Sequence, residues 1–379
     1  MTLCPRDDTV KPYIIHFLSS IALSSSLLFI PTLAIELGGS ESQIGIIIAA
    51  YALAMFISSY LFGRLSDTYS RRLFISLGLA VSAVVFSLQI LADPHFAISF
   101  LATPAFLAVI RAAAGFSLGI FPAALMVHVY DSAGPLGRFA AVGALGWAVG
   151  TFTAGVIAEI SSYYAIFISA SLCLWAAFIL SLTIKKVDCP RLKVPFFPKD
   201  LLKRNWRVYV PYLLRHTGAN TIWVTYPLFI ASLGGDKFWI GIIYTVNTGA
   251  QFIVMPFLDR FEGKRLIRIG LLLAIVTFFS FTLAQNFLHL LPIQVLLACS
   301  WAFMYVGSLL CLMKDNVEKA TSSGILTSVI YIAQVIGSLV GGVVAQLFGD
   351  FRATMYVAGI LTIVGFVLFS SNNKRGKAD

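Results

Sequence analysis

The chain has 379 residues, of which 59% are hydrophobic and only 12% are charged. Soluble globular domains carry about a quarter charged residues, so this composition excludes a soluble globule and predicts a membrane protein. The net charge of +10 would favour nucleic acid as the partner of a soluble protein. Here the basic residues collect in alternate loops, as they do in membrane proteins, and nucleic acid is not needed to explain them.

Apolar runs of about 20 residues, the length that spans a bilayer, recur along the whole chain. The first run is too long for the core of a signal peptide and lacks a convincing cleavage site, so we expect it to remain as the first helix. The twelve predicted spans are 13–35, 43–62, 73–92, 101–127, 139–159, 163–184, 208–232, 239–258, 266–285, 289–312, 323–347 and 353–371. The predicted fold is therefore an all-α membrane protein with both termini on one side.

Lysine and arginine indicate which side each loop faces. Of the 27 such residues, 23 fall in the terminal segments and in alternate loops, while Lys237 and Arg352 fall on the opposite side. The remaining two, Arg111 and Arg215, lie inside predicted spans. The positive-inside rule then predicts that the basic loops and both termini are cytoplasmic. We expect a monomeric, multi-pass protein of the cell (plasma) membrane with lipids around it.

The longest hydrophilic stretch, 185–207, divides six predicted spans from six. It carries eight basic residues and three prolines, and we interpret it as a cytoplasmic linker between an N-terminal half, 1–184, and a C-terminal half, 208–379. Such a basic connector should also be drawn to anionic lipid, but a plain role as a topology determinant is the favoured interpretation. The two halves echo each other, as where Pro12-Tyr-Ile-Ile-His16 returns as Pro211-Tyr-Leu-Leu-Arg215. Two homologous halves in one chain are typical of transporters.

A short charged turn, Gly63-Arg-Leu-Ser-Asp-Thr-Tyr-Ser-Arg-Arg72, joins the second and third spans. It resembles the loop between the second and third helices of the major facilitator superfamily, whose pattern is Gly-x-Leu-x-Asp-Arg-x-Gly-Arg-Arg. Five positions match in register, namely Gly63, Leu65, Asp67, Arg71 and Arg72. Thr68 stands where the family usually has Arg, and Ser70 stands where it usually has Gly.

The resemblance implies that this turn is a latch that holds the two halves together while the inner side is shut. Asp67 would accept hydrogen bonds from the exposed N–H groups of a neighbouring helix N-terminus, while Arg71 and Arg72 would reach phosphates or facing carboxylates. A topology loop without an energetic role is the alternative. The second half repeats the turn as Asp259-Arg260-Phe-Glu-Gly-Lys-Arg265, with one extra residue and no leading glycine. We expect this second latch to be the weaker one.

Small residues at helical spacing predict close helix packing. In the fourth span, Arg111-x-x-x-Gly115 resembles a second element of the same family. In the fifth span, a glycine-rich run resembles the family's antiporter element, but Thr151 replaces its proline and Ala154 replaces a glycine, which weakens the antiporter inference. The glycines that we expect to pack are Gly115, Gly119, Gly146, Gly150, Gly155, Gly337, Gly341 and Gly342.

An arginine inside a span is costly in lipid and indicates either a functional site or a structural residue bound by carbonyl groups. By family resemblance, the first, fourth, seventh and tenth helices line a central cavity, which His16, Arg111, Arg215 and His216 would make basic. Further polar and stacking contacts would come from Asn220, Trp223, Tyr226, Asn247, Gln251, Trp301, Tyr305, Tyr331 and Gln334. On the predicted topology, all 17 acidic residues fall in loops, tails or helix ends. A basic cavity without a carboxylate predicts a small organic anion as the substrate.

Motifs for other chemistry are missing from the sequence. It contains no Walker-type nucleotide loop, no His-Glu-x-x-His and no Gly-x-Ser-x-Gly, so we expect neither an enzyme nor a bound cofactor or metal. The predicted function is secondary transport of a small organic solute by alternating access, with a coupling proton or ion left open. The alternatives are proton-coupled efflux of neutral or cationic amphipathic drugs and, in another class, a non-transporting membrane sensor or assembly protein.

Overall fold

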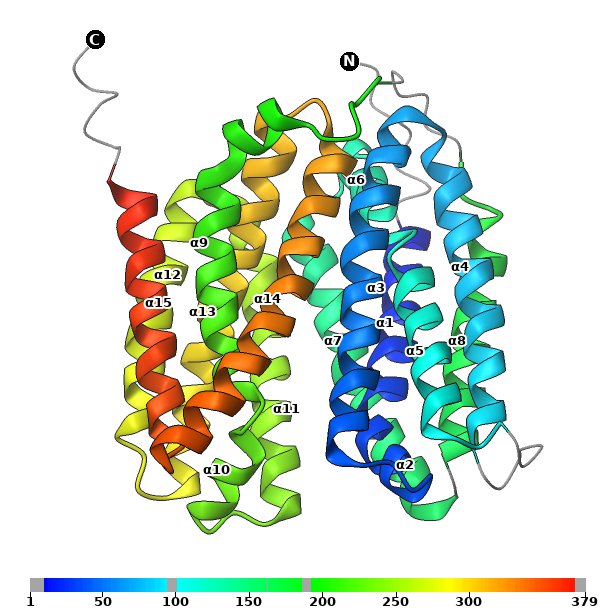
Figure 1. The fold of residues 1–379 in the computed structure, drawn as a ribbon. Helices are drawn as coiled ribbons and strands as arrows, with labels where there is room; N and C mark the ends of the chain where they lie inside the picture. Colours follow the sequence, from blue (N-terminus) through cyan, green and yellow to red (C-terminus); the bar gives the residue numbers. More distant parts are fainter. Residues whose placement is uncertain (1–9, 94–100, 162, 186–191, 372–379) are drawn as a thin grey trace. The chain divides into compact units, whose positions relative to one another are not determined.

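The structure, a computed structural model, describes residues 10–93, 101–161, 163–185 and 192–371. Over these ranges the chain is almost entirely helical and contains no strand (Figure 1). Eleven helical segments of the described chain are long and apolar enough to cross a membrane. The all-α membrane class predicted from composition is confirmed.

The chain divides into two compact units. The first comprises residues 1–196 together with 316–328, and the second comprises residues 197–315 together with 329–379. The short segment 316–328 therefore lies with the first unit, although it follows most of the second unit in sequence. The half boundaries at 184 and 208 and the extent of the linker stay predictions.

The first unit contains α1 to α8, with the 3-10 helix η2 after α4. Their bounds are Val10–Leu28 (α1), Ile30–Glu36 (α2), Glu41–Thr68 (α3), Arg71–Leu88 (α4), Gln89–Ala92 (η2), Pro104–Leu118 (α5), Pro122–Asp131 (α6), Leu136–Ile160 (α7) and Tyr163–Ser181 (α8). The second unit contains the rest, apart from the start of α14. Their bounds are Lys199–Trp223 (α9), Tyr226–Ser232 (α10), Lys237–Val254 (α11), Met255–Arg260 (η3), Gly263–Thr282 (α12), Phe287–His289 (η4), Leu290–Asp315 (α13), Lys319–Phe348 (α14) and Arg352–Ser370 (α15).

Three of the predicted spans consist of two consecutive α-helices, and each interruption lies next to a proline. Pro31, Pro122 and Pro227 occupy the first or second position of α2, α6 and α10. Proline is favoured at the start of a helix because its missing N–H is not needed there, and it disrupts the turn that precedes it. The apolar pattern continues through these breaks, which is why the sequence predicted single spans.

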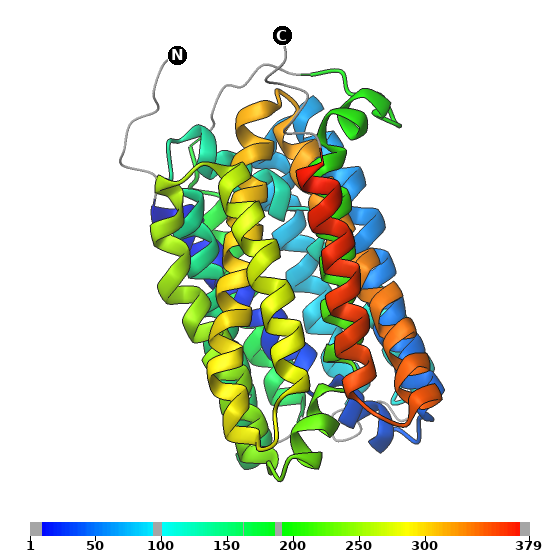
Figure 2. The same cartoon turned by 90° about the vertical axis from the view of Figure 1, so that its left-hand side faces the viewer.

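The seventh predicted span, 208–232, corresponds to α9 followed by α10, and it is not among the eleven apolar segments. Polar side chains, among them Arg207, Arg215, His216 and Asn220, make α9 more hydrophilic than the eleven apolar segments. About half of its residues are buried, and it packs along α15 (Figure 2). Protein contacts thus replace lipid around this helix.

In the first unit, α1 packs on α7 and α8, α3 packs on α5, and α4 packs on α8. Glycine permits the closest of these approaches, since a Cβ at Gly115 would clash with the Tyr51 carbonyl on α3. The other glycines predicted to pack against a neighbouring helix and found in contact are Gly119, Gly146, Gly150, Gly337 and Gly341. Gly155 and Gly342 face open space instead.

Candidate functional site

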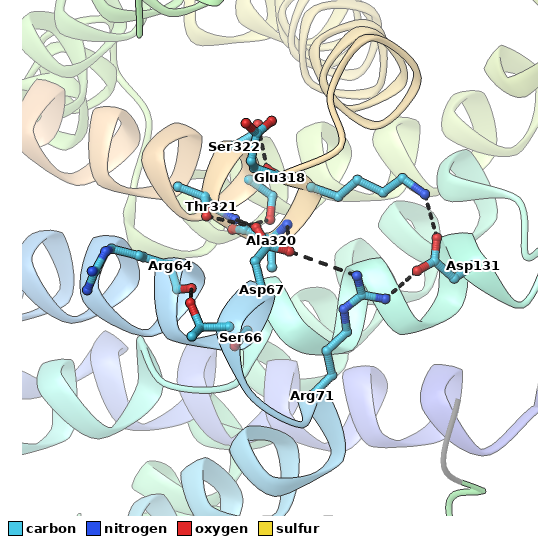
Figure 3. Close-up of polar contacts among 12 residues, drawn as sticks. Arg64, Ser66, Asp67, Arg71, Asp131, Glu318, Ala320, Thr321 and Ser322 are labelled. Carbon is cyan, nitrogen blue, oxygen red and sulfur yellow. Dashed lines mark hydrogen bonds and ion pairs between the residues drawn. The ribbon is translucent and has the colours of Figure 1, made fainter. Parts of the chain in front are cut away.

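The carboxylate of Asp67 lies at the N-terminus of α14, within the first unit (Figure 3). Its Oδ1 accepts a hydrogen bond from the Ala320 backbone N–H at 3.1 Å, and its Oδ2 accepts from the Thr321 N–H and hydroxyl, both at 2.7 Å. Asp67 itself is only 3% exposed. The first N–H groups of a helix have no intrahelical partner and carry partial positive charge. Asp67 of α3 therefore acts as a cap for a helix far away in the sequence.

Charges of alternating sign extend this cap. Arg71 Nη2 lies 3.9 Å from Asp67 Oδ1, and Arg71 Nη1 donates a hydrogen bond to Asp131 at the end of α6. The ammonium group of Lys319 donates to the other oxygen of Asp131 at 2.6 Å and lies 4.7 Å from the ring centre of Tyr130. We call Asp67, Arg71, Asp131 and Lys319 the charge cluster. Charged hydrogen bonds of this kind are stronger than neutral ones.

The α3 and α14 backbones touch beside the cap. A Cβ at Gly63 would clash with the Ala320 carbonyl and the Gly324 Cα, and a Cβ at Gly324 would clash with the Ser59 carbonyl. One turn further on, the Ser328 hydroxyl donates to the Phe56 carbonyl at 2.7 Å. Glycine at position 63 therefore permits the approach that brings Asp67 within reach of the helix end.

Residues 192–196, which we call the strap, lie along the same end of α3. The Leu192 N–H donates to the Asp67 carbonyl at 2.9 Å, and Arg64 Nε donates to the carbonyls of Val194 and Pro195 at 2.8 and 3.0 Å. The Tyr60 hydroxyl donates to the Phe196 carbonyl. Tyr60, Arg64 and Asp67 share one face of α3 because they are spaced by four and three residues.

Arg72 makes a different contact from the one expected of it. Its Nη2 donates to the Leu182 carbonyl at 2.6 Å, just beyond the C-terminus of α8. Positive charge is favourable at this end of a helix.

The second charged turn has another structure. Asp259 and Arg260 end η3, and Glu262 precedes α12 without a side-chain cap on that helix. The glycine of this turn, Gly263, lies against the Gly307 carbonyl of α13. Arg265 lies in the first turn of α12. The described contacts of this turn show no equivalent of the Asp67 cap.

Arg111, on α5, is 1% exposed and has several partners within the first unit. Its Nη1 donates to Gln89 Oε1 at 3.0 Å and to Ser26 Oγ at 3.4 Å. Its guanidinium carbon lies 4.5 Å from the ring centre of Tyr51. Contacts from α1, η2 and α3 thus fix this arginine in place.

Arg215, on α9, is 2% exposed and lies among aromatic rings of the second unit. Its Nη2 donates to Ser300 Oγ at 3.0 Å, and its guanidinium carbon lies 5.5 Å from the ring centre of Phe278 and 5.6 Å from that of Trp301. The structure brings two further candidates to the same indole, because the His216 ring lies 4.9 Å from Trp301 and the Tyr305 ring is stacked on it at 5.6 Å.

Three other candidates of the second unit form a chain of hydrogen bonds. Gln251 Nε2 donates to Asn247 Oδ1, Asn247 Nδ2 donates to Gln294 Oε1, and Gln294 Nε2 donates to the Tyr226 hydroxyl, at 2.6, 2.8 and 2.6 Å. Trp223 packs its ring against Tyr226. A small pocket beside this chain is lined by Trp223, Tyr226, Phe278 and Gln294, among others.

Other candidates lie apart from these groups. His16 is stacked on Phe139 with ring centres 4.0 Å apart, and it presses against Gly143 of α7. The Asn220 amide donates to the His216 carbonyl of its own helix at 2.8 Å. Tyr331 and Gln334 lie on the part of α14 that belongs to the second unit. Among the described residues, no cluster of His, Cys, Asp or Glu is arranged to hold a metal ion.

Sequence reasoning missed Asp131, Lys319, Thr321 and the strap. One signal was present for Asp131, because the Gly63–Arg72 turn holds three arginines but a single aspartate. That excess of positive charge calls for a carboxylate from elsewhere. The sequence offers no comparable signal for Thr321 or for the strap, whose hydrogen bonds use backbone groups.

Comparisons with known proteins bear on this arrangement. The family model described as Major Facilitator Superfamily matches residues 13–315 and 209–378. The chain is 26% identical to the quinolone resistance protein NorA of Staphylococcus aureus over 172 residues, which is 44% of each protein and so less than half of that relative's length. It is 23% identical to multidrug resistance protein 1 of Bacillus subtilis (strain 168) over 372 residues, covering 93% of this chain and 92% of the relative.

Two solved structures show the same fold. The human organic anion transporter MFSD10 (TETRAN) superposes with a TM-score of 0.80 at 16% identity, covering 97% of this chain and all of the other. A bacterial homologue of the iron transporter ferroportin, in an outward-facing state, gives a TM-score of 0.75 at 12% identity, covering 96% and 98%.

Proposed function

We propose that this chain, which belongs to the Major Facilitator Superfamily of transporters, carries a small organic solute across the cell membrane by alternating access, as a secondary transporter. It is a multi-pass membrane protein. Both termini on the cytoplasmic side, where the positive-inside rule places them, are part of the proposal. The proposal also includes a monomeric state and the use of an ion or proton gradient.

The observation that carries the proposal is the Asp67 cap on α14. A carrier that alternates between two states needs contacts that are made in one state and lost in the other. The cap consists only of hydrogen bonds and charge contacts between side chains and a helix end, so it can form and break without disturbing a hydrophobic core. The charge cluster that surrounds it strengthens the same contact.

The names of the relatives support transport but leave the substrate undecided. Quinolone resistance and multidrug resistance favour outward transport of drugs as a second candidate function. An organic anion transporter and a homologue of an iron transporter, in contrast, share the fold. Fold similarity says little about substrate, so the substrate class has to come from the residues of this chain.

Flux measurements in proteoliposomes test the proposal. The purified full chain would be reconstituted and offered a panel of labelled aromatic anions, neutral molecules and cations, with and without an imposed pH gradient or membrane potential. We expect saturable flux of one class, faster than in empty vesicles. Folded protein that binds no member of the panel, moves none of them and retains a partner protein would instead establish the non-transporting sensor.

A further inference from the structure

Three buried polar atoms in the second unit surround Trp301 and have no hydrogen-bond partner among the described residues. They are the Tyr212 hydroxyl, Arg215 Nε and His216 Nδ1. Each side chain lies close to the indole, since the Tyr212 and His216 ring centres are 5.8 and 4.9 Å from it and the Arg215 guanidinium carbon is 5.6 Å away. Positions 212, 215 and 216 share one face of α9.

Unpaired buried polar groups are rare in folded proteins, and each calls for an explanation. Two of these atoms, the Tyr212 hydroxyl and Arg215 Nε, are donors, and His216 Nδ1 donates in one of the two neutral tautomers. Two unsatisfied donors, with a third in that tautomer of His216, lie beside one ring and indicate that an acceptor binds there.

The charge of Arg215 points to the nature of that acceptor. Guanidinium stays protonated in proteins, and a buried charge normally has a charged partner. The contacts described for Arg215 are with neutral groups, namely the Ser300 hydroxyl and the rings of Phe278 and Trp301. The described carboxylates of the second unit lie at helix ends or in loops, at Asp200, Asp236, Asp259, Glu262, Asp315 and Asp350.

Arg111 offers a comparison in the same chain, because it has more described polar partners, although its own Nη2 is also buried without a hydrogen bond to a described residue. Its guanidinium donates to Gln89 and Ser26 and lies over the Tyr51 ring. Arg215 has one hydroxyl partner and an orphaned Nε in a setting that is equally buried. The two arginines that the sequence predicted as a pair are therefore different kinds of residue.

The cluster also has an accessible side. Trp301, His216 and Tyr305 are partly exposed, whereas Tyr212 and Arg215 are buried. The Trp301 and Tyr305 rings are nearly parallel, at 5°. Together these two rings form a flat aromatic platform, and its Trp301 ring lies beside a buried positive charge.

We propose that Tyr212, Arg215, His216 and Trp301 form the binding site for an oxyanion group, a carboxylate or phosphate, on a small aromatic solute. The proposal rests on the transport function proposed above and names its substrate class. Guanidinium and hydroxyl donors match the oxygens of such a group, and the aromatic platform matches the ring that carries it. The second unit supplies this site from its own residues.

Four probe molecules of similar size distinguish binding of an oxyanion from binding of a neutral or a cationic group. Benzoate and phenyl phosphate carry an oxyanion, benzamide is neutral, and benzylammonium is cationic. Thermal unfolding and calorimetric titration of the purified full chain in detergent would compare them. We expect one or both oxyanions to raise the unfolding temperature, while benzamide and benzylammonium leave it unchanged. Equal stabilisation by benzamide, or stabilisation by benzylammonium alone, would overturn the proposal, and so would no stabilisation by any aryl oxyanion.

Variants test the residues. Arg215→Gln should weaken oxyanion binding at least tenfold, and Tyr212→Phe should weaken it severalfold. Matched controls in the same unit are Arg352→Gln, whose parent side chain binds the Thr282 and Ala284 carbonyls, and Tyr244→Phe. Both control variants should bind the aryl oxyanion with the affinity of the parent protein.

The unliganded protein provides the second readout. If Arg215 is a binding residue without a charged partner, Arg215→Gln should leave the unfolding temperature unchanged or raise it. If the residue is purely structural, the variant should unfold at lower temperature and bind the oxyanion as before. Failure of this site is distinguishable from failure of the transport proposal, because oxyanion binding without flux would leave the site standing, whereas flux without oxyanion binding would leave only the transport function.

Discussion

The two units surround their buried charges differently. In the first unit, each member of the charge cluster contacts an oppositely charged neighbour near the N-terminus of α14. Arg111 of the same unit has amide, hydroxyl and ring partners. In the second unit, Arg215 is as deeply buried but has a hydroxyl and two rings around it. Paired charges hold structure together, whereas an unpaired one remains available to a ligand. The difference suggests that the first unit holds the contact that changes with state and the second unit holds the contact with solute.

Neutralising Asp67 is the strongest test of this difference between the units, and we expect the largest effect from it. Asp67→Asn removes the negative charge at the α14 N-terminus and one of the acceptor oxygens, and hydrogen bonds to charged groups contribute about 1.5–3 kcal/mol each. The populations of the two transport states should shift about tenfold or more, while folding changes little. We expect flux in proteoliposomes to fall at least tenfold with near-normal expression.

Asp259→Asn is the matched control, because this residue occupies the corresponding turn of the second half, near the end of η3. It should reduce flux much less. Normal turnover of a well-folded Asp67→Asn protein would show that the cap has no role in transport.

A second change tests the backbone contact that supports the cap. In Gly63→Ala the new Cβ meets the Ala320 carbonyl and the Gly324 Cα, both of which are main-chain atoms that cannot rotate away. The two helices would have to separate, and flux should fall severalfold. Gly155→Ala, at a glycine that faces open space, should leave flux unchanged. Similar flux from the two variants would contradict the assignment.

The contrast between the two arginines predicts a difference in stability. Arg111→Gln removes the donor that Gln89 and Ser26 share, and an unsatisfied buried acceptor costs about 1–3 kcal/mol. Its unfolding temperature should drop by roughly a few degrees. Arg215→Gln should show no such drop. Scanning calorimetry in one detergent would compare them, and equal losses would remove the distinction between the two sites.

The smallest effect is expected at the edge of the charge cluster. The Lys319 side chain is more exposed than that of Arg71, the other described partner of Asp131, and ion pairs that reach solvent contribute only about 0–1 kcal/mol. Lys319→Gln should therefore lower flux less than threefold, and high salt should reduce that difference further. A loss as large as that of Asp67→Asn would make Lys319 an essential part of the cap.

The sequence was a good guide where local pattern determines structure. Hydropathy placed the helices, and the spacing of Gly63 and Asp67 identified the turn that matters. Hydropathy did not show the breaks before α2, α6 and α10, because proline at a helix start interrupts the backbone without changing the apolar pattern. The seventh span was predicted as the apolar run 208–232, although helix α9, which begins earlier, is polar as a whole.

What could not be predicted depends on tertiary placement. Thr321 is 254 residues from Asp67, and nothing around either position indicates that they meet. Arg111 and Arg215 look alike in the sequence, since each is a single arginine in an apolar run. They are distinguished only by the residues that contact them in the folded protein. Those neighbours, Gln89 and Ser26 for one and Ser300 and Trp301 for the other, come from different helices.

The strap has a consequence for how related sequences can diverge. Tyr60 and Arg64 hold residues 194–196 through main-chain carbonyl oxygens, which every amino acid carries. Substitutions at position 195 should therefore be tolerated. Three other positions are constrained: the N–H of residue 192 binds Asp67 and excludes proline, the Val194 side chain is buried, and the Phe196 ring contacts Tyr60 and Arg64. Selection would act on Tyr60 and Arg64, so that orthologues retain the two side chains on α3 while position 195 varies.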